Sequence, residues 1–351
     1  MTSIAKPPVR HPGLPRNALG LTRRDYEGAM STLCAGCGHD SVTAALVEAC
    51  WELDVPPHGV AKLSGIGCSS KTTAYFLRQS HGFNSVHGRM PSVATGAHAA
   101  NRQLVCIGIS GDGDSLSIGL GQLCHAFRRN PRMLYVLENN GVYGLTKGQF
   151  SASADVGSKS KRGEANVQAP IDPVLLALAL GATFVARGFS GDKGQLVPLL
   201  KAGLLHDGLA FVDVISPCVS FADHEGSTKS YRYTRGHMHD VAPVDIVPVR
   251  HEITAASSAG AATSVTMHDG SVVRFRPVDE GHDPTDRDAA YAHVRAVQAR
   301  GEVPTGLLYL DAHTPSMHAA LRTGQEPLVG LAHEALCPGA AALEALMDEL
   351  R

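Results

Sequence analysis

The sequence predicts an α/β protein with a mostly parallel sheet flanked by helices, followed by a smaller C-terminal α+β extension. Two apolar runs, 105–109 and 133–137, are typical of buried strands. Between them, apolar residues recur with helical spacing from 117 to 128. A strand, a helix and a second strand in this order form a βαβ unit, in which the strands are parallel. From about residue 240 the pattern changes to a short hairpin and helices.

Composition excludes several classes of function. The chain has 351 residues, which suggests one large or two ordinary domains. With 44% hydrophobic and 18% charged residues it is typical of a globular protein. The net charge of −2 gives no overall attraction to nucleic acid or to a membrane surface. The basic clusters at 128–129 and 159–162 lack interleaved aromatic residues, so we interpret them as solvated faces.

The first 30 residues contain prolines and charges but no apolar segment typical of a signal peptide. The longest apolar run, 174–186, is too short to span a bilayer. We therefore expect a cytoplasmic protein with no membrane partner. Disulfides are rare in that compartment, so the eight cysteines are expected to be ligands or core residues.

The predicted elements follow one another through three regions. Residues 1–30 form an extended arm with turns, 31–240 form the main domain, and 241–351 form the extension. In the main domain we expect helices at 41–51, 92–100, 172–180 and 193–205, strands at 59–63, 183–186 and 209–215, and a functional loop at 150–168. In the extension we expect a hairpin (264–267 and 271–275, with Asp269-Gly270 in the turn), a helix at 286–300 and a terminal Ala/Leu-rich helix.

Two polar turns follow the strands of the βαβ unit. The first is Gly111-Asp112-Gly113-Asp114 and the second is Glu138-Asn139-Asn140-Gly141. Open parallel sheets bind ligands at the carboxyl ends of their strands, so Asp112 and Asn140 are expected to lie on adjacent turns. Their oxygens suit Mg²⁺, and a glycine before a helix N-terminus suits a diphosphate. A single GDG is usually only a turn, whereas the pair of turns predicts a phosphate site.

Four cysteines lie in predicted loops: Cys34, Cys37, Cys68 and Cys218. Cys68 and Cys218 each follow a predicted strand, so they can converge at the edge that carries Asp112 and Asn140. Four thiolates make either a structural zinc site or an iron–sulfur cluster. One CxxC pair with two isolated cysteines favours the cluster mildly. The remaining cysteines, Cys50, Cys106, Cys124 and Cys337, are expected to be ordinary small apolar residues.

The separation of GDG from Asn139-Asn140 resembles the thiamine diphosphate signature. Together with other segments, it resembles the beta subunit of 2-oxoacid:ferredoxin oxidoreductases. The segments are CAGCGHD (34–40), SGIGCSSK (64–71), HGRMPSVATG (87–96), GDGDSLSIG (111–119), ENNGVYGLTKGQFS (138–151) and ISPCVSF (215–221), with MHDGS (267–271), DPTDR (283–287) and LCPG (336–339) further on. Ala35 and Ala152 depart from the pattern, because proline is usual at both positions.

The resemblance implies a thiamine diphosphate-binding fold for residues 31–240 and a set of site residues. Asp112, Asn140 and the Val142 carbonyl would bind Mg²⁺, and Cys34, Cys37, Cys68 and Cys218 would hold a [4Fe-4S] cluster. Lys71, His87 and Arg89 would act on the substrate or face the diphosphate. The remaining cofactor contacts would be Gly67, Cys68, Ser69, Gly111, Gly113, Asp114, Asn140, Thr146, Lys147 and Gln149.

The implied reaction is the coenzyme A-dependent oxidative decarboxylation of a 2-oxoacid, either 2-oxoglutarate or pyruvate. Electrons would pass through the cluster to ferredoxin. Thiamine enzymes also need a glutamate near the aminopyrimidine, which a partner alpha subunit, separate or fused to a gamma subunit, would supply. Two alternatives remain: a cluster-free thiamine diphosphate decarboxylase or synthase subunit, and a zinc-stabilised binding module.

Overall fold

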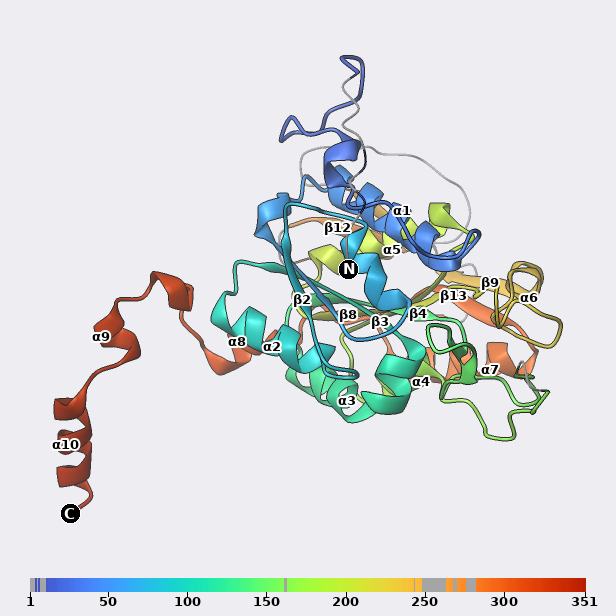
Figure 1. Ribbon diagram of the computed structural model, residues 1–351. Coiled ribbons are helices and arrows are strands. Elements are labelled where there is room, and N and C mark those ends of the chain that lie inside the picture. Colours follow the sequence, from blue (N-terminus) through green and yellow to red (C-terminus); the bar gives the residue numbers. More distant parts are fainter. Residues whose placement is uncertain are drawn as a thin grey trace.

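A computed structural model of the chain describes residues 11–160, 163–242, 244–247, 263–267, 270–275 and 282–351, together with Ile4 and Lys6. One large sheet lies between two layers of helices (Figure 1). The predicted fold class, a mostly parallel sheet flanked by helices, is confirmed.

The main sheet has eight strands in the order β2-β1-β3-β4-β8-β7-β13-β9. Their bounds are β1 Val60–Ser64, β2 His81–Asn84, β3 Val105–Gly111, β4 Met133–Asn139, β7 Phe184–Phe189, β8 Leu209–Ile215, β9 Met238–Ala242 and β13 Val303–Leu310. From β2 to β7 in that order, neighbouring strands are parallel. β13 runs antiparallel to β7, and β9 is parallel to β13. The loops after β1, β3, β4 and β8 therefore leave the same edge of the sheet.

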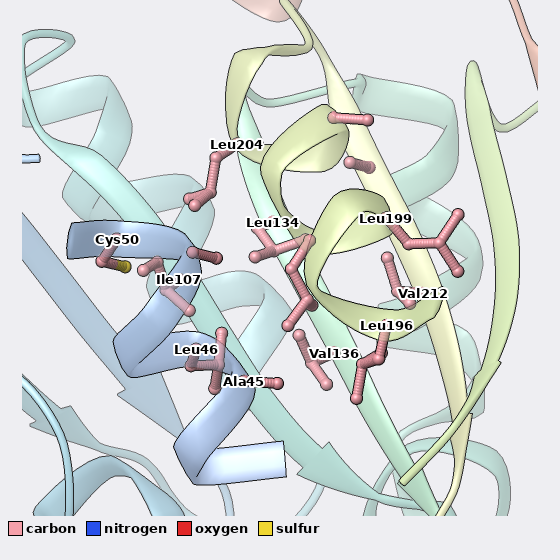
Figure 2. Close-up of a cluster of buried hydrophobic side chains, with 14 of the residues drawn as sticks. Ala45, Leu46, Cys50, Ile107, Leu134, Val136, Leu196, Leu199, Leu204 and Val212 are labelled. Carbon is pink, nitrogen blue, oxygen red and sulfur yellow. The ribbon is translucent and has the colours of Figure 1, made fainter. Parts of the chain in front are cut away.

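Helices cover both faces of the sheet, as Figure 1 shows. The bounds are α1 Gly38–Glu52 and α5 Lys193–Leu205 on one face, and α2 Met90–Ala100, α3 Leu120–Arg129, α4 Pro173–Ala179 and α7 Arg287–Ala299 on the other. Strand side chains alternate between the faces, so Leu134 and Val136 join the first cluster while Tyr135 joins the second. Figure 2 shows Leu134 and Val136 packed between Leu46 of α1 and Leu196 of α5.

Smaller elements complete the described part of the chain. They are the hairpin β5 Val142–Tyr143 and β6 Gln149–Phe150, the antiparallel strands β10 Val244–Val247, β11 Thr263–Thr266 and β12 Val272–Phe275, and the helices α6 Tyr231–His237, α8 Met317–Leu321, α9 His333–Leu336 and α10 Ala340–Glu349. Short helical segments lie at Arg23–Tyr26, Pro57–Gly59, Ser69–Ala74, Gly113–Ile118 and Leu328–Gly330. The segment with α9 and α10 lies apart from the main body (Figure 1), and its residues are exposed.

Most predicted elements between residues 31 and 240 are confirmed, with ends that shift by a few residues. β11 and β12 confirm the strands of the hairpin, whereas Asp269 in its turn lies outside the described residues. The sequence did not predict β2, β9 or β13. All four residues of β2 are exposed, so it carries no buried apolar pattern. β13 contains Pro304 and Gly306, which are unusual inside strands, and its pairing with β7 shifts register after Leu307.

The aromatic packing at β8 predicts a large loss of stability on truncation. Phe211 is fully buried, and its ring centroid lies 5.3 Å from that of Phe127 in an edge-to-face contact. We expect Phe211→Ala to lower the free energy of unfolding in urea by about 3–5 kcal/mol, because the lost side chain leaves a cavity. Val329→Ala, at a position that is 92% exposed, is the control and should change it by less than about 0.5 kcal/mol. Equal losses in the two variants would contradict this account of the core.

Candidate functional site

A pocket lies at the edge of the sheet where β1, β3 and β4 end. Its lining is His39, Ile66, Gly67, Cys68, Ser69, His87, Gly111, Asp112, Gly113, Asp114, Glu138, Asn140, Val142, Tyr143, Gly144, Leu145 and Thr146. Eleven of these are site residues predicted from the sequence: Gly67, Cys68, Ser69, His87, Gly111, Asp112, Gly113, Asp114, Asn140, Val142 and Thr146. The two polar turns of the βαβ unit thus form one wall of a single pocket.

The turns after β3 and β4 are joined by a direct hydrogen bond. The backbone N–H of Gly141 donates to Asp112 Oδ2 at 2.8 Å. Gly141 has φ of 79°, a conformation that favours glycine. In the same turn, Asn140 Oδ1 accepts a hydrogen bond from the Val142 backbone N–H at 3.1 Å. Carboxylate and amide oxygens thus come together in the pocket, and they are the ligands that Mg²⁺ prefers.

Two serines that the sequence did not single out hold the Asp112 carboxylate. Ser151 Oγ and Ser153 Oγ donate to Asp112 Oδ2 at 2.5 and 2.7 Å. Burial raises the pKa of Asp112, and these two hydroxyls oppose that rise. Among the described residues, every hydrogen bond recorded for this carboxylate ends on Oδ2. The serines therefore orient the carboxylate while supporting its ionised form.

Asp114 bonds to two neighbouring loops around the pocket, those that carry Ile66 and Gly88. Its Oδ1 accepts from the backbone N–H groups of Gly88 at 2.7 Å and Ile66 at 3.2 Å, and it contacts His87 Nδ1. A Cβ atom at Gly65 would lie only 1.9 Å from Asp114 Oδ2, so glycine is required there. Asp114 was expected to contact the cofactor. Its carboxylate is occupied by protein donors, which supports a positioning role.

Of the three residues expected to act on the substrate, only His87 lines the pocket. His87 is half-buried at the pocket wall, and its ring lies 6.2 Å from that of Tyr143. Lys71 is half-buried in the helical turn Ser69–Ala74 and interacts electrostatically with Cys68. Arg89 is exposed at the start of α2 and does not line the pocket.

Three predicted cofactor contacts lie in the β5–β6 hairpin: Thr146 and Lys147 in its turn and Gln149 at the start of β6. Thr146 lines the pocket, and its hydroxyl donates to Gln149 Oε1 at 2.6 Å. Lys147 and Gln149 are exposed and do not line it. For Arg89, Lys147 and Gln149, a direct contact with the ligand remains a prediction.

The four predicted cysteine ligands gather beside this pocket. Gly38, directly after the CxxC pair, donates from its N–H to Pro217 O at 3.1 Å, next to Cys218. A Cβ at Gly144 would lie 3.4 Å from Cys68 Sγ and 3.7 Å from Cys218 Sγ, so both sulfurs approach the same glycine. Ser220 Oγ lies 3.6 Å from Cys34 Sγ. The convergence expected from the fold therefore occurs, and Cys68 belongs to both the pocket and the cysteine group.

Burial and mutual proximity shape the chemistry of these thiols. Burial raises the pKa of Cys37 to about 12 and also raises the pKa values of Cys68 and Cys218. Cys34 adds to the rise at Cys68 and Cys218 because the groups are close. Over the described ranges, no group of three or more His, Cys, Asp or Glu side chains could hold a single metal ion. In an iron–sulfur cubane each cysteine binds a different iron, so the sulfurs surround the cluster instead of meeting at one ion.

His39 and Glu138 are pocket residues to which the sequence assigned no role. Both are buried, and His39 Nδ1 lies 3.4 Å from Glu138 Oε2 and 2.6 Å from Ser216 Oγ. Burial lowers the pKa of His39 to about 4 and raises that of Glu138 well above its usual value. His39 is therefore neutral at neutral pH, and burial favours the protonated form of Glu138. The sequence offered one indication of their role: His39 is two residues after Cys37, and Glu138 is two residues before Asn140.

Similarity to known proteins agrees with this geometry. Residues 65–214 match the family described as thiamine pyrophosphate enzyme, C-terminal TPP binding domain. The 2-oxoacid:ferredoxin oxidoreductase subunit beta of Saccharolobus solfataricus is 40% identical over 211 residues, which are 60% of this chain and 68% of that protein. The 2-oxoglutarate oxidoreductase subunit KorB of Mycobacterium tuberculosis is 40% identical over 191 residues, covering 54% of this chain and 51% of that protein.

A solved structure shares the fold over most of both chains. It is a 2-oxoglutarate:ferredoxin oxidoreductase from Magnetococcus marinus with 2-oxoglutarate, coenzyme A and succinyl-CoA bound. The TM-score is 0.71 at 29% sequence identity, and the match covers 90% of this chain and 94% of that chain.

The fold and the pocket define a thiamine diphosphate-binding protein. Within that class, the chain belongs to the family of 2-oxoacid:ferredoxin oxidoreductase beta subunits, and it is a subunit of an oxidoreductase. Within the described residues, no helix is long and apolar enough to cross a membrane.

The buried histidine predicts a loss of stability in acid. The pKa of His39 is about 4 in the folded chain against an ordinary value of 6.5, so the unfolded chain binds more protons between these values. Stability that is present above pH 6.5 is then lost as the pH falls toward 4, by about 3 kcal/mol in total. We expect His39→Asn to flatten this part of the pH dependence of urea unfolding. An unchanged slope between pH 6.5 and 4 would show that other groups dominate it.

Proposed function

We propose that this chain is the thiamine diphosphate-binding beta subunit of an enzyme that oxidatively decarboxylates a 2-oxoacid, with coenzyme A as acyl acceptor and ferredoxin as electron acceptor. One observation carries the proposal. The hydrogen bond from Gly141 to Asp112 brings the GDG turn and the Asn-Asn turn together in a pocket whose wall includes Cys68. A diphosphate site and a group of cysteines are thereby neighbours, as coupled decarboxylation and electron transfer require.

The oxygen donors support Mg²⁺ as the bound ion. Asp112 supplies a carboxylate, Asn140 an amide oxygen and Val142 a backbone carbonyl, and hard oxygen donors of this kind suit Mg²⁺ shared with phosphate oxygens. The cofactor, when bound, supplies an electron sink for decarboxylation. The chain's own residues would hold the ion, place Gly111 and Gly113 against the diphosphate, and support the ionised form of Asp112 through Ser151 and Ser153.

The cysteine group supports a [4Fe-4S] cluster held by Cys34, Cys37, Cys68 and Cys218. None of the eight cysteines forms a disulfide, which supports a reducing compartment, and we place the protein in the cytoplasm. Thiolates are the protein ligands of such clusters. The raised pKa values of Cys37, Cys68 and Cys218 mean that the thiols stay protonated until iron displaces their protons.

The substrate and the partners follow from the relatives. The Magnetococcus marinus enzyme has 2-oxoglutarate and coenzyme A bound, which supports 2-oxoglutarate over pyruvate as the first substrate to test. We assign Lys71, His87 and Arg89 to the substrate carboxylates or the diphosphate. A partner alpha subunit would supply the glutamate for the aminopyrimidine, since Glu138 in this pocket is held by Thr72 and His39. We also propose that the thiamine diphosphate-binding domain spans residues 31–240, between the N-terminal arm and the C-terminal extension.

Removal of the metal carboxylate is the first test. We expect Asp112→Ala to weaken Mg²⁺-dependent binding of thiamine diphosphate by at least about 100-fold, measured by calorimetry, because a direct metal ligand is lost. Asp288→Asn, at an exposed position in α7, is the control and should bind as the wild type does. Full binding by Asp112→Ala would remove Asp112 from the metal site, and the absence of binding by the wild type would reject the proposed function.

The cluster gives an independent test by absorption. The chain purified without oxygen should contain about four atoms of iron and show an absorption shoulder at about 400 nm that dithionite bleaches. Cys68→Ala should lose both signals, whereas Cys124→Ala, in α3, should keep them. A colourless chain that binds thiamine diphosphate would support the cluster-free enzyme instead. Zinc without thiamine diphosphate binding would support the binding module.

A further inference from the structure

A buried row of polar side chains extends from Asp112 into the sheet, away from the pocket. Ser153 Oγ donates to Asp112 Oδ2 at 2.7 Å and lies 2.8 Å from Asn139 Oδ1. Asn139 Nδ2 donates to Asp213 Oδ1 at 3.0 Å. Arg187 Nε donates to Asp213 Oδ2 at 2.7 Å. The row therefore crosses from the loop after β6 through the end of β4 and through β8 to β7.

These side chains are almost entirely removed from solvent. Ser153 is 1% exposed, Asn139 3%, Asp213 0% and Arg187 5%. Burying charged and polar groups costs free energy unless they are paired, so such a row is maintained only with its partners in place. Arg187 also donates from Nη2 to Asp172 Oδ2 at 2.9 Å, which anchors the row at the start of α4.

The donors and acceptors in this row determine how each side chain is oriented. An ionised carboxylate can only accept hydrogen bonds, so Asp213 takes the Nδ2 end of Asn139 and turns Oδ1 toward Ser153. Arg187 holds Asp213 through the opposite oxygen, which leaves Asp213 little freedom to rotate. Ser153 Oγ lies within hydrogen-bond distance of both Asn139 Oδ1 and Asp112 Oδ2, and its single hydrogen can be donated to only one of them at a time. The position in which Asp213 holds Asn139 therefore determines how Ser153 shares that hydrogen with Asp112. The position of Arg187 thereby affects the orientation of the Asp112 carboxylate, through Asp213, Asn139 and Ser153.

We propose that Asn139, Ser153, Asp213 and Arg187 act together as positioning residues that set the metal affinity of Asp112. The inference rests on the proposed function, because it takes Asp112 as the Mg²⁺ ligand. It assigns a role to Asn139, the first asparagine of the Asn-Asn pair. Asn139 would not bind the ion itself but would help to orient Asp112, which does. Residues of this kind orient the direct ligands, and their loss weakens metal binding about 10- to 100-fold.

The near end of the row is tested with Ser153→Ala in the full chain, isolated in its native assembly. The probe is Mg²⁺, titrated in the presence of thiamine diphosphate, with bound cofactor measured by equilibrium dialysis. We expect the Mg²⁺ concentration for half-saturation to rise about 10- to 100-fold. The thermal midpoint is recorded alongside, because a merely structural role would lower stability without moving the Mg²⁺ dependence.

The far end is tested with Arg187→Met, which does not touch Asp112. We expect Mg²⁺ binding to weaken about 2- to 30-fold, the usual range for coupling through intervening residues. In the Ser153→Ala background the same change should have no further effect, because the row is already interrupted. Asp213→Asn, which keeps the side-chain volume, replaces Arg187→Met if that variant does not fold.

A matched control separates the row from general damage. Arg287→Met removes another guanidinium, one that lies over the Tyr309 ring at 5.2 Å and outside the row, and should leave Mg²⁺ binding unchanged. Equal weakening by Arg187→Met with and without Ser153 would overturn the inference, as would unchanged Mg²⁺ affinity in Ser153→Ala. Those outcomes leave the proposed function intact. A wild type that shows no Mg²⁺-dependent binding overturns both.

Discussion

Parallel pairing of β1, β3, β4 and β8 is the constraint on which the site depends. The register places Gly111 opposite Glu138 and Asn139 opposite Ile215. Since the strands run the same way, the residues that follow them, Asp112, Asn140 and Ser216, come out at the same level of one edge. No local propensity could bring these turns together. The backbone hydrogen bonds of the sheet do so, and side chains such as Asp114 then only close the gaps between neighbouring loops.

The same constraint explains what the sequence could predict. Asp112 and Asn140 each come three residues after the end of an apolar run, so a strand prediction was enough to place them on adjacent turns. Cys68 and Cys218 were placed by the same argument. Ser153 lies 41 residues from Asp112, and its contact depends on the path of a long loop, which no pattern specifies.

Residues inside strands were harder still to recognise as functional. Arg187 and Asp213 are charges within apolar strands, and their pairing depends on β7 and β8 being neighbours, which sequence order alone does not give. β13 was missed because Pro304 and Gly306 interrupt its pattern. Buried Lys62 is a similar case, since it donates to Thr73 O and Phe76 O at 2.6 Å and thereby fastens the turn that carries Lys71 to β1. Burial lowers the pKa of Lys62 to about 8.

The four proposed cluster ligands differ in their exposure to solvent. Cys34 is exposed together with Ala35 and Gly36, whereas Cys37, Cys68 and Cys218 are half-buried. In the proposed enzyme, Cys34 would be the most exposed ligand of the iron–sulfur centre. The side of the centre nearest solvent would serve electron transfer, and it would also be the side that dioxygen reaches most easily. A cover over Cys34 that kept dioxygen out would also block electron transfer, so the same surface would govern both properties.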